Sequence, residues 1–280
     1  MRMAYVRSDE LIHSATSPYT YASPSIKMNA ITTAVLNKSK VEVSLIRIED
    51  ATKDSFVMSL MGRTTKIGVV TATISAMTVD LVGPKGIFGR LDLPTHKMGS
   101  FGGDIRVFKQ VIRILDMVAF KAFVQSILQD EDLVLRLDNG QAAVRAVGMT
   151  AHIVYRKDLH LKGLTSLTST LIQVKPFGNE YESTFCLYNP SPFEIDLGTV
   201  LFQVQDEHGK VIAEQKGSTF LMRGGACYSV VTGHIAGTVS EGKARFIGLG
   251  VEGDSWVRDI IDLVDIKATI PSVFRVWHAS

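Results

Sequence analysis

The stretch Phe185–Gly198 reads FCLYNPSPFEIDLG and decides how the fold is interpreted. An asparagine precedes the first of two prolines, and alternating apolar residues lie on both sides. Asn189 can bond its own following backbone, and Pro190 ends strand pairing because it has no N–H. Asn189-Pro190-Ser191 is not a glycosylation acceptor, because Pro occupies the middle position. The stretch therefore predicts a strand, a turn and the restart of a strand.

The same alternation of apolar and polar residues continues on both sides of this turn. Upstream it is clear in SFVMSL (55–60), MTVDLV (77–82) and LVLRL (133–137). Downstream it continues in GTVLFQVQ (198–205) and ARFIGLGV (244–251). Short period-2 runs separated by Gly, Pro, Asn and Asp are typical of an antiparallel β-sandwich. We expect a mainly β protein of two tandem immunoglobulin-like antiparallel β-sandwiches.

The predicted boundaries follow from changes in these patterns. Residues 1–25 are rich in Ser, Thr, Tyr and Pro, show no period, and are expected to form an irregular arm. The first sandwich is predicted over residues 26–165 and the second over 166–280, where a second series of strands begins. The two halves share one order of strands, polar breaks and short runs, as expected of one unit used twice.

One segment has a helical period instead. In DMVAFKAFVQSILQDED, apolar residues recur at i, i+3, i+4, i+7 and i+8, and no Pro or Gly interrupts them. This spacing places one apolar stripe on one face of a helix, and Asp116 is available as its N-cap. The sequence predicts an α-helix at about 117–129 that covers the open end of the first sandwich.

Composition limits the classes of function. The chain has 280 residues, 46% of them hydrophobic, and a formal net charge of only +2, which gives no electrostatic argument for nucleic acid. Its mean hydropathy is +0.17, yet the uncharged run 67–79 is too short to span a bilayer and no secretory h-region is present. We expect a cytoplasmic protein without stable membrane insertion. Its apolar residues must then fill a core, a ligand cavity or an interface, which leaves a homo-oligomer open.

FCLYNPSPFEIDLGTVLFQVQDEHGKVI resembles the late-embryogenesis-abundant group-2 domain, also called the water-stress and hypersensitive-response domain. In that domain a strand ends in Asn-Pro, an apolar residue follows, and a Gly opens the next strand. DSFVMSLMGRTTKIGVVTATIS, GRLDLP (89–94), the Phe-rich helix and LHLKGLTSL (159–167) are similar to a fungal domain of unknown function built on the same sandwich. The resemblance covers roughly residues 30–270 and implies the scaffold, but it says little about chemistry.

The chain carries no phosphate loop, dinucleotide fingerprint, HExxH motif, nucleophile elbow or EF-hand spacing. Its seven histidines are scattered, and none pairs at a ligand spacing beside a carboxylate. We therefore expect no cofactor and no metal. A hydrophobic small molecule is the expected partner.

Candidate site residues come from the polar groups of one strand-like run and from aromatic residues near the termini. The candidate proton donors are His152, Tyr155, Arg275 and His278. The candidate walls of a ligand pocket are Tyr19, Tyr21, Trp256, Phe274 and Trp277. Aromatic walls suit a pocket, especially at a domain interface. The alternative is that these residues simply pack or lie on the surface.

Two functions remain open. In the first, the protein binds an apolar small molecule and promotes a cofactor-independent cyclisation, dehydration or hetero-Diels–Alder cycloaddition in fungal secondary metabolism. Such chemistry needs orientation, a hydrogen-bond donor and the exclusion of water. In the second, it is a non-catalytic stress module, or a module that binds lipids or other hydrophobic ligands, as the resemblance implies. The terminal aromatic residues favour the cyclase-like enzyme at this stage.

Overall fold

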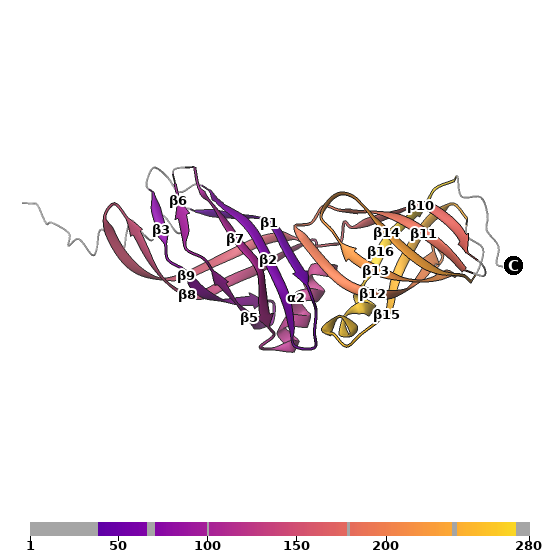
Figure 1. Cartoon of the computed structure of the whole chain (residues 1–280), viewed down its shortest axis with the longest axis horizontal. Coiled ribbons are helices and arrows are strands. Elements are labelled where there is room, and N and C mark those ends of the chain that lie inside the picture. Colours follow the sequence, from indigo (N-terminus) through magenta and orange to yellow (C-terminus); the bar gives the residue numbers. More distant parts are fainter. Residues whose placement is uncertain (1–38, 66–70, 100, 178–179, 237–239, 273–280) are drawn as a thin grey trace, which may run out of the picture.

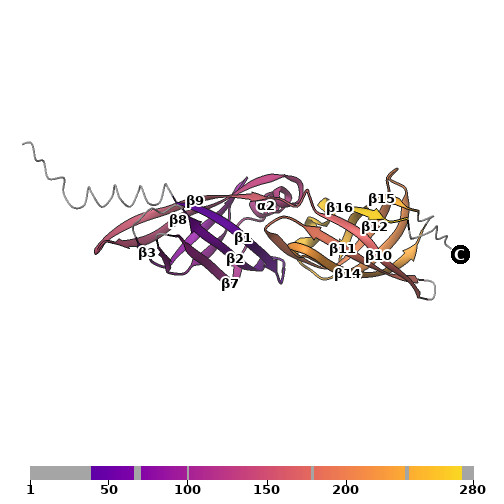
Figure 2. The same cartoon turned by 90° about the horizontal axis from the view of Figure 1, so that it is seen from above.

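The computed structural model describes residues 39–65, 71–99, 101–177, 180–236 and 240–272. Their main elements are sixteen β-strands and one α-helix. Figures 1 and 2 show two halves that follow one another along the long axis, β1–β9 in the first and β10–β16 in the second. The predicted mainly β fold is confirmed, and the one α-helix among the described residues is the predicted one.

The first half contains two sheets. Its strands are β1 (Lys40–Glu49), β2 (Ser55–Thr65), β3 (Ala72–Ile74), β4 (Met77–Gly83), β5 (Gly86–Leu93), β6 (His96–Met98), β7 (Gly103–Arg113), β8 (Asp132–Ala146) and β9 (Met149–Lys162). One sheet contains β1, β2 and β7, and the other has the order β5-β4-β8-β3-β6 with β9 paired to β8. On β2, the side chains of Phe56, Met58 and Leu60 are buried, as their alternation predicts.

The second half is a sandwich whose perimeter is closed by hydrogen bonds. Its strands are β10 (Thr168–Phe177), β11 (Glu180–Asn189), β12 (Phe193–Asp206), β13 (Val211–Leu221), β14 (Gly224–Ile235), β15 (Gly242–Val251) and β16 (Asp265–Ile270). The pairings run β12-β13-β14-β11-β10-β16-β15 and return to β12. These seven strands therefore form a closed barrel, which leaves none of them as a free edge along its whole length.

The expectation of purely antiparallel pairing is corrected at two places. β10 pairs with β16 in parallel, and β1 pairs with β12 in parallel through Ile46↔Phe193 and Ile48↔Ile195. Both pairs join strands that are far apart in the chain, and parallel pairing needs such a long connection. Because β1 pairs with the first residues of β12, before the segment that pairs with β15, one ten-stranded sheet runs through both halves.

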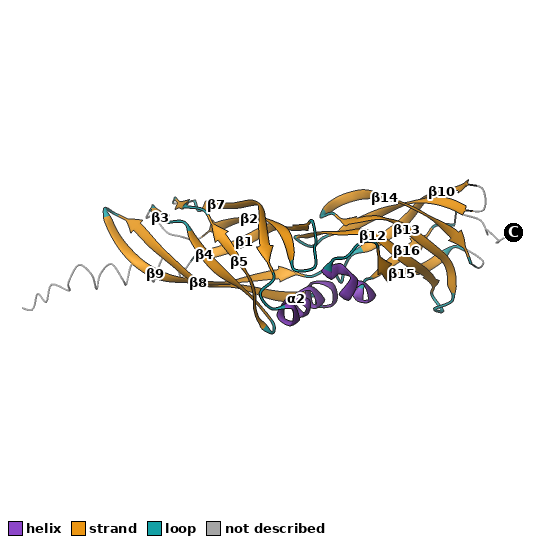
Figure 3. Cartoon of the chain, turned by 60° about the horizontal axis from the view of Figure 1, so that its bottom comes forward, coloured by secondary structure: helices purple, strands orange, loops and turns teal. Residues whose placement is uncertain are grey.

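Helix α2 (Met117–Gln129) lies at the junction of the two halves. Asp116 caps it as predicted, since its side chain accepts hydrogen bonds from the backbone N–H groups of Val118 and Ala119. Figure 3 shows α2 beside the short 3-10 segments η1 (Trp256–Asp259) and η2 (Ile261–Leu263) of the second half. Among the described residues, no helix is long and apolar enough to cross a membrane.

Phe120 and Phe123 of α2 join the hydrophobic cores of the two halves. Phe120 stacks on Phe56 of β2, with ring centroids 5.0 Å apart, and meets Trp256 edge to face at 4.9 Å. Phe123 contacts Phe193 of β12 at 6.3 Å. The buried residues accordingly form one continuous apolar cluster that extends through both halves.

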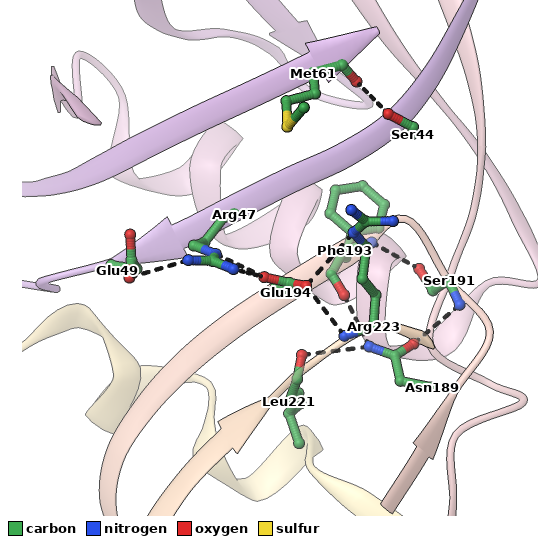
Figure 4. Close-up of polar contacts among 10 residues, drawn as sticks. All are labelled: Ser44, Arg47, Glu49, Met61, Asn189, Ser191, Phe193, Glu194, Leu221 and Arg223. Carbon is green, nitrogen blue, oxygen red and sulfur yellow. Dashed lines mark hydrogen bonds and ion pairs between the residues drawn. The ribbon is translucent and has the colours of Figure 1, made fainter. Parts of the chain in front are cut away.

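The Asn-Pro turn has the role that its sequence predicts, with additional bonds (Figure 4). β11 ends at Asn189, which is fully buried. Its amide donates to the carbonyl oxygens of Phe193 (2.8 Å) and Leu221 (3.3 Å), and its oxygen accepts from the N–H of Ser191 (2.9 Å). The Ser191 hydroxyl donates to the carbonyl oxygen of Lys162 at 2.8 Å. One side chain thus holds the turn and the ends of β12 and β13.

The role expected for Gly198 is corrected. The strand after the turn begins at Phe193, and Gly198 lies inside it, where the pairing register with β13 shifts between Asp196 and Gly198. Gly198 has a φ of +72°, and its N–H donates to the Asp196 carboxylate at 2.9 Å. A positive φ favours glycine, so Gly198 can adopt the backbone conformation of the β-bulge at this position.

Candidate functional site

Most of the terminal candidate residues lie outside the part of the chain that the structure describes. They are Tyr19, Tyr21, Phe274, Arg275, Trp277 and His278. The structure does place His152, Tyr155 and Trp256.

His152 and Tyr155 lie on β9 but on opposite faces of it. His152 is exposed, whereas Tyr155 is buried, with 7% of its surface accessible. Burial raises the pKa of Tyr155 to about 12, so its hydroxyl is neutral at physiological pH. The two side chains therefore do not form one proton-transfer site.

Trp256 is a packing residue of the junction. Only 1% of its surface is accessible, and its ring meets Phe120 and Phe56 edge to face. It lines none of the cavities described below.

Tyr155 does border a small cavity in the first half, beside the buried His96 and Thr64. The Thr64 hydroxyl donates to the carbonyl oxygen of Gly103 and also hydrogen-bonds Nε2 of His96, both at 3.0 Å. The cavity has about 20 Å³ of space for the centres of water-sized molecules. It can hold a single water but no organic ligand.

We predict that His96 makes the first half sensitive to acid. Burial lowers the pKa of His96 from its ordinary value of 6.5. The unfolded chain then binds protons more readily than the folded chain, so this part of the stability is present above pH 6.5 and is lost as pH falls below it. Urea unfolding at pH 7.5, 6.5 and 5.5 should show this loss, and His96→Gln should reduce it. His208→Gln, at an exposed histidine of the second half, is the control, and an equal effect of both variants would contradict the assignment.

A mainly apolar cavity lies inside the barrel of the second half. Its lining is almost entirely apolar: Leu171, Val174, Phe185, Val204, Ile212, Ala213, Ile235, Ala244, Phe246, Ala268 and Ile270, with Tyr181, Ser183 and Gln215 as the polar members. The space for the centres of water-sized molecules is about 40 Å³. A cavity of this size can hold a few water-sized groups.

The three polar side chains come from two strands. Alternation on β11 turns Tyr181, Ser183 and Phe185 to the barrel interior, and Gln215 faces them from β13. The Ser183 hydroxyl donates to Oε1 of Gln215 at 3.1 Å. Each of the three is at least nine-tenths buried.

The Tyr181 hydroxyl has no hydrogen-bond partner among the described residues, although its oxygen is buried. Burial raises the pKa of Tyr181 far above its usual value. Gln215 offsets this rise in part, although the geometry between the two side chains is not that of a hydrogen bond. Tyr181 therefore presents a neutral, unused O–H donor to an apolar cavity.

A second cavity of about 30 Å³, by the same measure, continues through the barrel interior. Both cavities are lined by Phe185 and Phe246, whose rings meet edge to face at 4.5 Å. The Ser169 hydroxyl lines the second cavity and is likewise buried without a partner among the described residues. The aromatic pair thus borders two small spaces, each with one unused hydroxyl group.

The sequence patterns alone did not single out Tyr181, Ser183, Gln215 or Ser169. The pattern that could have revealed Ser183 is the alternating run Tyr181, Ser183, Phe185, Leu187, in which one inward position is polar. A polar residue at a core position is an informative observation, because polar residues are mostly exposed. Nothing in either run, however, indicates that β11 and β13 face one another.

Residues 87–204 match a family model described as "Protein of unknown function (DUF3712)". The match extends from β5 to β12 and includes α2 and the Asn-Pro turn. The expected resemblance to a domain of unknown function is confirmed for this region, which is less than half of the chain. No curated protein matches.

Two solved structures show distant similarity. Red sea bream transglutaminase is 10% identical over 90% of this chain and 34% of its own, with a TM-score of 0.24. The calcium binding domain CBD12 of CALX1.1 is 9% identical over 80% of this chain and 99% of its own, with a TM-score of 0.18. The chain thus spans about a third of the length of the transglutaminase. Similarity this weak carries no argument about function.

Proposed function

We propose that this protein binds an apolar ligand carrying one hydrogen-bond acceptor inside the barrel of its second half. The observation that carries this proposal is the buried, unpartnered hydroxyl of Tyr181 at the wall of an apolar cavity. Leaving a buried polar group unpaired costs about 1–3 kcal/mol. Native proteins seldom keep such a group without a partner, which suggests that the partner is a bound molecule.

The shape of the interior favours a narrow ligand. Pockets for compact drug-sized molecules measure about 300–1,000 Å³, far more than the space beside Tyr181. A short alkyl or acyl chain needs less width, and Phe185 and Phe246 supply apolar walls to both cavities. A carbonyl or carboxyl oxygen of the ligand would accept from Tyr181.

This geometry supports ligand binding better than the cyclase-like function expected at first. Tyr181, Ser183 and Gln215 supply a neutral donor and a hydrogen-bonded pair. A proton-transfer reaction also needs a group that can accept a proton from the reacting atoms, and no histidine or carboxylate lines this cavity within the described residues. The proposed role is therefore that of a hydrophobic-ligand-binding module, the alternative that the family resemblance implied.

Tyr181→Phe tests the proposal because it should change stability and affinity in opposite ways. Removing an unpartnered buried hydroxyl should raise the free energy of unfolding of the unliganded protein by about 1 kcal/mol. Loss of the donor should weaken binding of a small apolar ester, methyl butyrate, about fivefold. Calorimetric titration and urea unfolding measure the two effects.

Two further variants complete this test. Ala213→Leu adds atoms to the cavity wall and should weaken binding more than Tyr181→Phe does. Tyr155→Phe makes the same chemical change at the buried tyrosine of the first half and should leave affinity unchanged. Unchanged affinity in both Tyr181→Phe and Ala213→Leu would refute a ligand site in the barrel.

A further inference from the structure

We propose that the groove between the two halves binds a phosphate group, either free or on a lipid head group. It measures about 520 Å³ by the same measure as the barrel cavities, within the range of ligand-binding pockets. Its walls come from the end of β9, the Val43–Ser44 segment of β1, the Asn-Pro turn and the start of β14. It shares no lining residue with the barrel cavity, so this proposal is independent of the previous one.

The charged residues of the lining are all basic. Lys162 and His160 lie on the wall from the first half and Arg223 lies on the wall from the second. No Asp or Glu of the described residues lines the groove. Two cations, one from each half, suit a dianion such as phosphate, and the planar guanidinium of arginine matches its oxygen atoms. Ser44 and Tyr188 also line the groove, and the Ser44 hydroxyl donates to the carbonyl oxygen of Met61 at 3.3 Å.

The Glu194 carboxylate contacts two arginines, Arg47 and Arg223, and holds Arg223 in place. Glu194 is buried, and its Oε2 accepts from Nε and Nη2 of Arg47, both at 2.6 Å (Figure 4). The other oxygen, Oε1, contacts the backbone N–H of Arg223 at 3.4 Å and its Nε at 3.5 Å. These contacts are longer than an ordinary charge-assisted hydrogen bond. Glu194 therefore orients Arg223 while leaving much of its donor capacity for a ligand.

The ammonium group of Lys162 pairs with exposed carboxylates. Its Nζ lies 2.9 Å from Asp132 and 3.4 Å from Glu131, and all three side chains are more than half exposed. Exposed ion pairs contribute about 0–1 kcal/mol. An anion in the groove can therefore compete with them for the ammonium group.

The two walls are connected through the Asn-Pro turn. Ser191 donates to the carbonyl oxygen of Lys162, and Asn189 bonds the carbonyl oxygen of Leu221, two residues before Arg223. The backbones that carry the two cations are thus joined to the same buried turn. Such preorganisation lowers the entropic cost of binding.

The test is a titration of the whole chain with inorganic phosphate at constant ionic strength, followed by calorimetry. Wild type should bind saturably. Arg223→Gln and Lys162→Gln should each weaken binding at least fivefold, and the double variant should abolish it. Arg245→Gln is the matched control, because Arg245 forms an exposed ion pair with Asp265 away from the groove. It should bind like wild type.

A second arm of the experiment identifies the source of the phosphate. If the ligand is a lipid head group, vesicles containing phosphatidate should bind more tightly than phosphatidylcholine vesicles, and the same two variants should lose this preference. If the ligand is a free phosphate, the two kinds of vesicle should bind alike while inorganic phosphate still binds. Absence of saturable binding to any phosphate probe, or equal losses in Arg245→Gln and the groove variants, would overturn the proposal. Should Arg223→Gln fail to fold, the exposed Lys162→Gln decides alone.

Discussion

Replacing Phe120 with alanine should lower the free energy of unfolding by about 3–5 kcal/mol, the usual cost of removing a fully buried phenylalanine. Phe120 has no accessible surface. Its ring contacts Phe56, Phe88 and Trp256, which come from three different elements. Truncation therefore leaves a cavity with walls from both halves, and these walls are parts of packed sheets that cannot easily collapse into it.

Because the core is continuous, we expect this substitution to destabilise both halves together. Urea unfolding followed by circular dichroism should keep a single transition that moves to lower urea concentration. Val118→Ala is the matched control, since Val118 lies on the same helix with 63% of its surface exposed, and its effect should stay within about 0.5 kcal/mol. Nearly equal effects of the two variants would show that Phe120 does not hold the junction.

Replacing Asn189 with alanine should cost about 3 kcal/mol. The change leaves two carbonyl oxygens, of Phe193 and Leu221, and the N–H of Ser191 without their present partner in a buried environment, and each such loss costs about 1–3 kcal/mol. The estimate is at the low end of the sum, because water can enter from the adjacent groove and satisfy part of the loss. The same change should also weaken phosphate binding in the groove, because the Asn-Pro turn forms part of its wall.

Thermal and urea unfolding measure the loss of stability, and the phosphate titration measures the loss of affinity. Gln125→Ala removes another hydrogen-bonded amide, but one that lies exposed on α2 and bonds Gln129 at 2.9 Å. Its effect should remain below about 0.5 kcal/mol. An Asn189→Ala protein as stable as Gln125→Ala would mean that the turn is held by its prolines rather than by the buried amide.

Helix α2 and the Asn-Pro turn could be predicted from the sequence because both depend on neighbouring residues. The apolar stripe and the cap of the helix lie within fourteen residues, from Asp116 to Gln129, and the turn bond joins Asn189 to Ser191. The separation of His152 from Tyr155 was predictable too, since three positions along a strand place side chains on opposite faces. The bulge at Gly198 was not, because it depends on the register with β13.

By itself, the sequence determined the local structure of this protein: period-2 strands, one capped helix, and the turn that links β11 to β12. Only the tertiary structure decided that the second half closes as a barrel and that β1 continues its sheet. It alone placed Tyr181 and Ser183 with Gln215, and Lys162 and Arg223 in the lining of one groove. The physical reason is that the periodicity of a strand or helix depends on neighbouring residues, whereas strand pairing joins residues far apart in the chain. The Asn-Pro stretch belongs to both levels, because its turn is local and its buried amide also bonds Leu221, 32 residues later.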